Sequence, residues 1–275
     1  MKPATSRYFR LSLPRRWIGD LLYFANKIPS VPVERVMELR ELQTHRDRAG
    51  ISWPSIFLKA FGLTAQRHPE LRQSLIEYPW QRGYEHPHSV ASVAIERQYK
   101  GEPAVFFAQV QAPEKHGLQS IDRELKTFRN EPVESFGYFR RVIRFARLPK
   151  LVRRFAWWIS LYWSGNKRAK RLGTFGLSVY ASLGASSVHP LSPLSYLLNY
   201  GVMDEQGRIT VRFIYDHRIV DGAVIARALA TMEAILTGAI QSELITLSRP
   251  TQGSTSHESS EHAATDRCHE SLVSG

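Results

Sequence analysis

The stretch VRFIYDHRIVDGAV, residues 211–224, sets a histidine and an aspartate four positions apart between two periodic patterns. Before this pair, apolar side chains alternate with polar ones, which predicts a strand with one buried face. The alternating side chains are Ile209, Val211, Phe213 and Tyr215. After the pair, apolar residues recur every three or four positions to about residue 240, which predicts a helix. The loop between the two elements holds His217, Arg218, Asp221 and Gly222.

This loop has a structural and a catalytic interpretation. A carboxylate at Asp221, directly ahead of a helix, can accept hydrogen bonds from the free backbone N–H groups of the first turn. A neutral imidazole at His217 can instead take the proton of a thiol or hydroxyl. A position between a strand and the start of a helix would hold that imidazole rigidly for the task. The spacing alone leaves both interpretations open.

The other periodic segments alternate between helix and strand types. Helices are expected over about 14–25, 33–50, 53–68, 117–130 and 221–240, with a short strand near residue 7. Strands or buried runs are expected at 88–98, 102–111, 173–184, 192–203 and 205–217. Such mixing predicts an α/β domain over residues 1–249. The polar, serine-rich residues 250–275 are expected to be disordered.

Composition narrows the class of protein. The single cysteine, Cys268, excludes a disulfide framework and a thiolate metal site, and it favours a reducing, cytoplasmic location. The basic N-terminal segment lacks an apolar run of secretory length. No run of about 18 uninterrupted apolar residues is present, so no spanning helix is expected.

The net charge of +12 is concentrated in one window. Residues 140–171 contain eleven Lys or Arg and no Asp or Glu, and the rest of the chain has 26 basic and 25 acidic residues. Aromatic and aliphatic residues are interleaved with these cations, as in helices that lie in the plane of a membrane surface. We favour an anionic membrane as the partner of this window. The alternatives are an acidic carrier protein, a packed structural helix pair and a nucleic acid, of which the nucleic acid is not expected.

The loop residues DHRIVDG, 216–222, resemble the Asp-His-Arg-x-x-Asp-Gly signature of the acyltransferase catalytic domain of 2-oxo acid dehydrogenase complexes. The His-x-x-x-Asp core of that signature also marks chloramphenicol acetyltransferase and the condensation domains of peptide synthetases. Residues 173–179, GTFGLSV, are similar to the family's Gly-Thr-Phe-Thr-Ile-Ser-Asn segment, and residues 51–74 resemble a family helix that ends in Pro-Glu-Leu-Asn. The order and spacing agree over about residues 8–240. The resemblance implies a two-layer α/β sandwich of the chloramphenicol acetyltransferase type, a mixed sheet with helices on one face.

The resemblance also implies a mechanism in which an acyl group leaves a coenzyme A thioester without help from a metal. His217 would be the general base, and the Ser178 hydroxyl would donate a hydrogen bond to the oxyanion of the intermediate. Asp221 would organise the loop through an arginine. Arg218, Gly222 and Thr174 would bind substrate or organise the loop. The family works as a homotrimer, with the histidine and the serine of one site contributed by neighbouring subunits.

Three features depart from the family pattern. Gly176 stands where the family usually has threonine, and about residues 136–171 stand where it has a short connection. The first residues already match the family's catalytic domain, so no lipoyl domain is expected ahead of it. We therefore expect a free-standing acyl-coenzyme A-dependent acyltransferase with a thiol, hydroxyl or amine acceptor, lipid-linked or carrier-bound, at the cytoplasmic side of a membrane. The alternatives are a dihydrolipoyl acyltransferase component that acts on a separate lipoyl chain, and a non-catalytic trimeric scaffold.

Other histidines are weaker candidates. His86 and His88 form a His-Pro-His pair that we interpret as an exposed turn rather than a metal site. The metal-capable side chains of the tail have no recognised spacing; they are His257, His262, Cys268 and His269. No metal site is expected.

Overall fold

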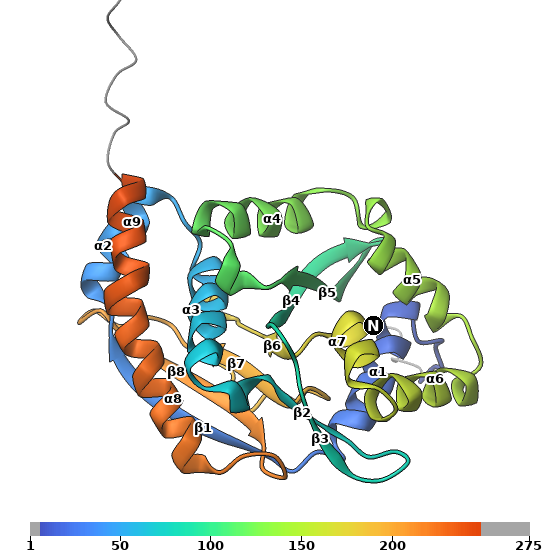
Figure 1. The fold of residues 1–275 in the computed structure, drawn as a ribbon. Coiled ribbons are helices and arrows are strands. Elements are labelled where there is room, and N and C mark those ends of the chain that lie inside the picture. The colour runs from blue at the N-terminus through green and yellow to red at the C-terminus, as the bar shows by residue number, and fades with distance from the viewer. Residues whose placement is uncertain (1–5, 249–275) are drawn as a thin grey trace, which may run out of the picture.

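A computed structural model describes residues 6–248. A six-stranded mixed sheet in the order β1-β8-β7-β6-β4-β5 occupies its centre (Figure 1). The strands are β1 (Ser30–Glu38), β4 (Val90–Tyr99), β5 (Glu102–Gln111), β6 (Phe175–Leu177), β7 (Tyr196–Tyr200) and β8 (Arg208–Asp216). The short strand β6 pairs in parallel with β4 and β7, and the remaining neighbours pair in an antiparallel manner. A separate hairpin joins β2 (Gln73–Ile76) to β3 (Arg82–Glu85).

Helices cover one face of this sheet along most of its width. They are α2 (Arg40–Ala49), α3 (Trp53–Arg67), α4 (Leu118–Asn130) and α8 (Gly222–Ile235), which continues through a π-helical turn (Leu236–Ile240) into α9 (Gln241–Ser248). Their apolar sides and the sheet enclose the main core, in which the Phe61 and Phe175 rings stack with centroids 3.9 Å apart. Short 3₁₀ turns lie at Pro69–Arg72, Pro113–Lys115, Val133–Ser135 and Ala181–Leu183. The expected α/β class with a mixed sheet is confirmed.

The N-terminal part of the chain differs from the expectation. Residues 33–38, expected as the start of a helix, belong to β1, and α2 begins only at Arg40. The reason is tertiary, because β1 pairs with β8 along its whole length, from Ser30 opposite Asp216 to Glu38 opposite Arg208. Residues 6–12 form no strand, so the strand expected near residue 7 is wrong. The tail over residues 250–275, expected to be disordered, lies outside the described residues.

A second helical cluster lies at the other side of the sheet (Figure 1). It consists of α1 (Leu13–Ala25), α5 (Gly137–Ala146), α6 (Lys150–Tyr162) and α7 (Gly165–Leu172). Its apolar core contains Trp17, Leu21, Phe24, Val142, Ala146, Trp157, Leu161, Tyr162, Leu172 and Leu194. Phe107 of β5 packs against this cluster, whereas its neighbour Phe106 belongs to the main core. Since successive strand residues point to opposite faces, α1 lies on the face opposite α3.

A buried ion pair fastens α6 to α1. The Arg153 Nε donates to Asp20 Oδ2 over 2.5 Å, and both side chains are buried. Arg153 also donates through Nη1 to the Leu148 carbonyl, 2.8 Å away. The next guanidinium, that of Arg154, stacks over the Tyr23 ring at 3.6 Å.

The helix from Gly222 to Ser248 is the one segment within residues 6–248 that is long and apolar enough to cross a membrane, with a mean hydropathy of 1.6. Of its most apolar window, 39% is buried inside the protein. The buried side chains pack against α3 and β1. The core helix of a soluble protein meets the same criterion of length and composition.

Arg153→Ala should lower the free energy of unfolding by about 3–5 kcal/mol, because it leaves the Asp20 carboxylate buried without its partner. The control is Arg154→Ala, which removes a more exposed cation 3.9 Å from Asp20 and should cost no more than about 1 kcal/mol. Urea unfolding of both variants measures the difference. Equal losses would show that the pair does not hold α6 in place.

Candidate functional site

The loop after β8 is fixed by the carboxylate of Asp216. This buried carboxylate accepts hydrogen bonds from Arg218 through the backbone N–H at 3.1 Å, Nε at 2.9 Å and Nη2 at 2.8 Å. Arg218 also donates through Nη1 to Glu77 Oε1, 2.9 Å away. These two carboxylates raise the pKa of the Arg218 guanidinium. Arg218 therefore closes the loop onto the end of β8 and onto the segment after β2.

His217 projects from this loop with its side chain 49% exposed. Its backbone N–H donates to the Pro29 carbonyl over 3.1 Å, which ties the loop to the start of β1. The ring Nδ1 lies 3.6 Å from Asp221 Oδ1. A carboxylate on this side favours the tautomer with the proton on Nδ1, so Nε2 keeps its lone pair for a proton from elsewhere.

Asp221 was expected to pair with an arginine. Within the described residues, the arginine of this loop binds Asp216 instead, and the ionisable side chain beside Asp221 is that of His217. Asp221 is the N-cap residue of α8, yet its side chain makes no capping hydrogen bond there and is 84% exposed. Gly222 begins the helix beside the Tyr215 hydroxyl, which would lie 3.1 Å from a Cβ at that position.

Thr174 and Ser178 flank the short strand β6. The buried Thr174 hydroxyl accepts from the Val90 N–H at 2.9 Å and donates to the Val90 carbonyl at 3.2 Å, so it joins β6 to β4. The backbone of Ser178 is held by two contacts: its N–H donates to the Leu198 carbonyl at 3.2 Å, and its carbonyl accepts from Asn199 Nδ2 at 2.5 Å. Within the described residues the Ser178 hydroxyl itself has no protein partner, so it is available to a ligand.

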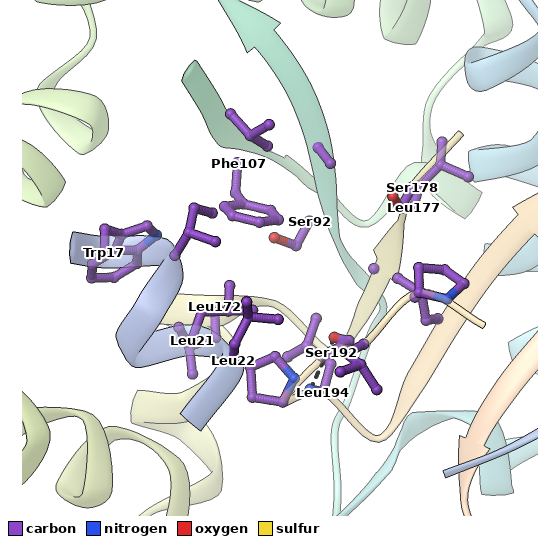
Figure 2. Close-up of a pocket in the computed structure, with 18 of the residues that line it drawn as sticks. Trp17, Leu21, Leu22, Ser92, Phe107, Leu172, Leu177, Ser178, Ser192 and Leu194 are labelled. Carbon is purple, nitrogen blue, oxygen red and sulfur yellow. Dashed lines mark hydrogen bonds between the residues drawn. The ribbon is translucent and has the colours of Figure 1, made fainter. Parts of the chain in front are cut away.

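Ser178 lies at the wall of an apolar cavity of about 480 Å³ (Figure 2). Helix α1 borders the cavity on one side, strands β4, β5 and β6 form its floor, and residues 187–197 close it. The apolar lining includes Trp17, Leu21, Leu22, Phe107, Leu172, Leu177, Leu194 and Leu197. Gly176 lies on the floor, where a Cβ would come within 2.5 Å of the Leu197 side chain. The missing family threonine is thus replaced by packing of Leu197 against bare backbone.

A second apolar cavity, of about 420 Å³, lies behind the first. The two share a wall that is formed by Trp17, Tyr138, Trp157 and Leu172. The indole N–H groups of Trp17 and Trp157 are buried and have no hydrogen-bond partner in the part of the chain that the structure describes. Burial raises the pKa of the Tyr138 hydroxyl to about 12. Helices α1 and α6 therefore supply aromatic walls to both cavities.

His217 and Ser178 do not meet within one chain. Leu177 is level with Leu198 on β7, and Leu198 is opposite Phe213 on β8. Ser178 is consequently level with about residue 212, five residues before His217, which is roughly 17 Å along the strand. Two strand spacings of about 4.8 Å add to this separation. His217 is also absent from the lining of the cavity at Ser178.

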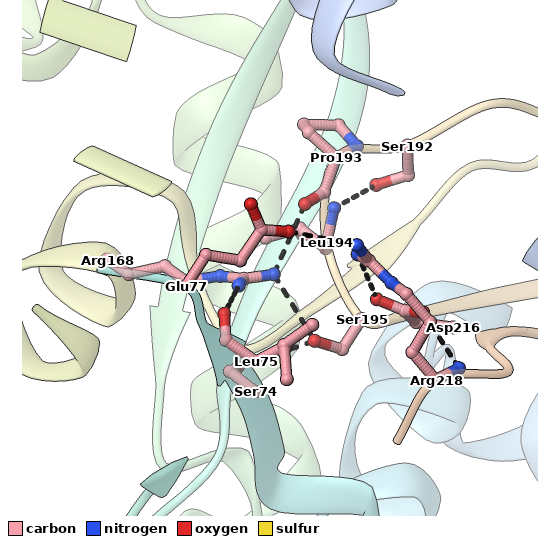
Figure 3. A network of polar contacts seen from close by, with 10 residues as sticks. All are labelled: Ser74, Leu75, Glu77, Arg168, Ser192, Pro193, Leu194, Ser195, Asp216 and Arg218. Atoms are coloured by element: carbon pink, nitrogen blue, oxygen red, sulfur yellow. Dashed lines mark hydrogen bonds and ion pairs between the residues drawn. The ribbon is translucent and has the colours of Figure 1, made fainter. Parts of the chain in front are cut away.

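A buried polar network supports the loop from the side of the helical cluster (Figure 3). The guanidinium of Arg168, on α7, donates to the carbonyls of Leu75 and Pro193 at 3.0 and 3.2 Å and to Ser195 Oγ at 3.2 Å. The Ser195 carbonyl in turn accepts from the backbone N–H of Asp216 at 2.9 Å. Burial lowers the pKa of Arg168 to about 10, which still leaves it charged at neutral pH. Sequence reasoning missed this arginine because nothing local distinguishes it from the other cations of the window.

His86 joins the same network, and the exposed turn expected there is wrong for this residue. The ring is buried, and its Nε2 lies 3.0 Å from Ser74 Oγ. Burial, followed by the charge of Arg168, lowers the pKa of His86 to about 4. Within residues 6–248, no group of three or more His, Cys, Asp or Glu side chains could hold a metal ion.

The fold is that of dihydrolipoamide acetyltransferase catalytic cores. A probable dihydrolipoamide acetyltransferase from Listeria monocytogenes is 15% identical, with a TM-score of 0.59 over 90% of this chain and 98% of that one. The cubic core of a pyruvate dehydrogenase multienzyme complex gives 15% identity and a TM-score of 0.62 over 88% and 96% of the chains. The dihydrolipoamide acetyltransferase of Azotobacter vinelandii is 15% identical, with a TM-score of 0.61 over 87% of this chain and 94% of that one. No family model and no curated protein match the sequence. The expected fold type is confirmed.

Stability should fall as the pH drops below about 6.5, because the unfolded chain protonates His86 while the folded chain resists until about pH 4. The folded state therefore loses up to roughly 3 kcal/mol across this window, at 1.36 kcal/mol per pKa unit. The variant His86→Gln keeps a side chain that can hydrogen-bond to Ser74. Its free energy of unfolding should change less steeply with pH, by an amount that corresponds to about one fewer proton taken up on unfolding. Thermal unfolding between pH 4 and 8 measures it, with the exposed His116→Gln as control. An unchanged slope in His86→Gln would contradict the assignment.

Proposed function

We propose that the protein transfers an acyl group from a coenzyme A thioester to a thiol, hydroxyl or amine acceptor, with His217 as the general base. The observation that supports this most strongly is the geometry of the loop. There, Nδ1 of His217 faces Asp221, and Nε2 has no hydrogen-bond partner among the described residues. The fold supports the reaction class, since it is shared with acetyltransferase cores. In the Azotobacter vinelandii enzyme, a serine, a histidine and an asparagine four positions after it have been investigated for the catalytic mechanism. The present chain has Asp221 at the corresponding spacing.

The proposed steps follow from these side chains. The His217 Nε2 takes the proton of the acceptor as the acceptor attacks the thioester carbonyl, and a tetrahedral oxyanion forms. The Ser178 hydroxyl donates a hydrogen bond to this oxyanion, a contribution of about 2.7–4 kcal/mol for one such donor. The carbon–sulfur bond then breaks, and coenzyme A leaves with the proton that the imidazole returns. Asp221 holds the tautomer and stabilises the imidazolium in between.

The separation of His217 from Ser178 requires that each site combine two copies of the chain. The imidazole is half exposed just beyond the end of β8, and the Ser178 hydroxyl lies in a cavity at the level of Arg212, near the middle of that strand. We therefore propose a homotrimer, in which the His217 loop of one subunit reaches the Ser178 cavity of the next. A closed ring of three identical heterologous contacts forms three equivalent sites.

The cavity beside Ser178 suits an acyl chain longer than acetyl. Its volume of about 480 Å³ far exceeds the roughly 30 Å³ that one water-sized group, such as a methylene, occupies. Most of its lining is apolar, and the Ser178 hydroxyl at its wall could meet the thioester carbonyl oxygen. Burial of each methylene contributes about 0.8 kcal/mol. We propose medium- or long-chain acyl thioesters as the donors.

His217→Ala should lower thiol release from acyl-coenzyme A by about 10²–10⁴-fold, because the base is lost. Ser178→Ala should lower it by about 10²–10³-fold, because the oxyanion loses a donor. Thiol release with a panel of donors and acceptors measures both. Turnover that is unchanged in His217→Ala, or absent from the wild type with every donor, would favour the scaffold alternative.

Co-expression of the two variants tests the shared site. If the histidine and the serine come from different subunits, random mixing restores about a quarter of the wild-type sites. A site within one chain would remain inactive in every mixed assembly, and such a result would overturn the trimer proposal while leaving the chemistry intact. An assay with free dihydrolipoamide as the only acceptor tests the alternative that the protein acylates a lipoyl group on a separate chain.

Ala94→Phe should shift the donor preference toward short chains. Ala94 lies on β4 in the cavity floor and is half-buried, so the added ring fills the space proposed for the acyl chain. We expect kcat/KM for decanoyl-coenzyme A to fall by about tenfold or more, and the value for acetyl-coenzyme A to change little. Ala226→Phe, at an exposed position of α8, is the matched control. Equal losses for both donors would argue against an acyl chain in this cavity.

A further inference from the structure

Helix α6 is apolar on two sides, and only one of them is covered. Its inner side carries Trp157 and Leu161, which are buried against α1. Its outer side carries Leu151, Val152 and Phe155, which are respectively 82%, 49% and 63% exposed. Trp158 and Ile159, one turn further on, are half-buried. Folding of the domain buries the inner side and leaves the outer side in contact with water.

Aromatic residues from a second segment extend this outer side. Tyr78, in the loop between β2 and β3, packs against Trp158 and Trp163 with ring centroids 5.2 Å away in each case. Phe155 stacks near Trp158 at 6.3 Å. Tyr78 and Trp163 are both partly exposed. We call these residues the α6 face; they are Tyr78, Leu151, Val152, Phe155, Trp158, Ile159 and Trp163.

The helices that carry and adjoin the α6 face present exposed cations. These are Arg140, Arg141, Arg144, Arg147, Lys150, Lys167, Lys170 and Arg171. Within the described residues none of the eight forms an ion pair with a carboxylate, whereas Arg153 and Arg154 have Asp20. No acidic residue occurs between residues 140 and 171. The cations are therefore available to an anionic partner.

We propose that the α6 face docks on a membrane surface that contains anionic lipid. Aromatic and aliphatic side chains would enter the region of the headgroups and acyl chains, and the neighbouring cations would meet lipid phosphates. Each cation close to such a surface contributes about 1 kcal/mol. Half of the eight would therefore suffice for measurable binding at moderate salt.

Two other partners, a second copy of the chain and a nucleic acid, match the α6 face less well than a membrane does. A second copy of the same face would bring like charges together with no carboxylate in the window to separate them. A nucleic acid would engage the cations through its phosphates but would leave the aliphatic side chains of Leu151 and Val152 in water. A bilayer surface satisfies the apolar and the cationic parts together.

Docking at this face would place the bilayer close to the proposed acyl-chain cavity. Trp157, on the inner side of α6, lines both cavities, and the diameter of a helix with its side chains is about 10–12 Å. An amphiphilic acyl thioester or acceptor held at the surface would have a short path to Ser178. The docking itself requires no catalysis, so it can fail or succeed independently of the proposed function.

Vesicle flotation with the full chain tests the proposal. The probes are vesicles of phosphatidylcholine alone and vesicles with about 30% phosphatidylglycerol, each at low and at high salt. We expect flotation with the anionic vesicles, a loss of at least about tenfold in the partition coefficient at 0.5 M salt, and little binding to phosphatidylcholine. A protein that stays at the bottom in every arm, or that binds poly-glutamate or RNA in preference to the anionic vesicles, overturns the proposal.

Paired variants locate the surface. Leu151→Ser/Phe155→Ser should lower partitioning by about tenfold or more, whereas Leu183→Ser/Val188→Ser, which changes exposed apolar residues elsewhere, should not. Arg144→Gln/Arg147→Gln/Lys150→Gln should weaken binding and flatten its salt dependence. Its control is Arg48→Gln/Arg123→Gln/Arg129→Gln, three exposed cations on α2 and α4. Circular dichroism confirms that each variant folds. If a test variant and its control lost vesicle binding equally, the α6 face would not be the docking surface.

Discussion

The pairing of β8 with β7 and of β7 with β6 is the constraint on which the site depends. Because β8 runs antiparallel to β7 and β6 runs parallel to it, the chain leaves β8 and β6 in opposite directions, and Ser178 stays level with the middle of β8. The loop of His217 and the hydroxyl of Ser178 are thereby separated in every copy of the chain. If both groups act in one reaction, as proposed, each site needs two copies of the chain, and loss of the assembly would also abolish activity.

The elements predicted from sequence are those whose periodic apolar residues face the core. Strand β8 shows strict alternation because its inner side chains are buried, and α3 and α4 were found for the corresponding reason at helical spacing. Strand β1 was mistaken for a helix because, as an edge strand, it keeps Met37 alone fully buried. Its strand character comes from pairing with β8, a partner about 180 residues away that no local pattern shows.

The site was predictable only in part. The spacing within one loop identified His217 and Asp221 as candidate site residues, and in the structure their ring and carboxylate face each other. The partner of Arg218 could not be read locally, since Asp216 and Asp221 are both within a few positions and burial decides between them. Ser178 was found through the resemblance alone. The cavity beside it is assembled from α1, three strands and the segment before β7. The lowered pKa of His86 comes from its burial and then from the charge of Arg168, some 80 residues later in the chain.

In the basic segment 140–171, contacts within the fold account for some residues but not for others. Arg153 is buried with Asp20, and Arg168 holds the backbone of residues 75 and 193 near the His217 loop. The inner side of α6 closes two cavities through Trp157. None of these contacts involves Leu151 or Phe155, which stay 82% and 63% exposed in the folded chain. Polar residues at both positions would leave the same core and a more soluble surface. An apolar outer side, flanked by cations that have no carboxylate partner within residues 6–248, is the feature from which the proposal of membrane docking is argued, because a membrane matches the chemistry of both parts.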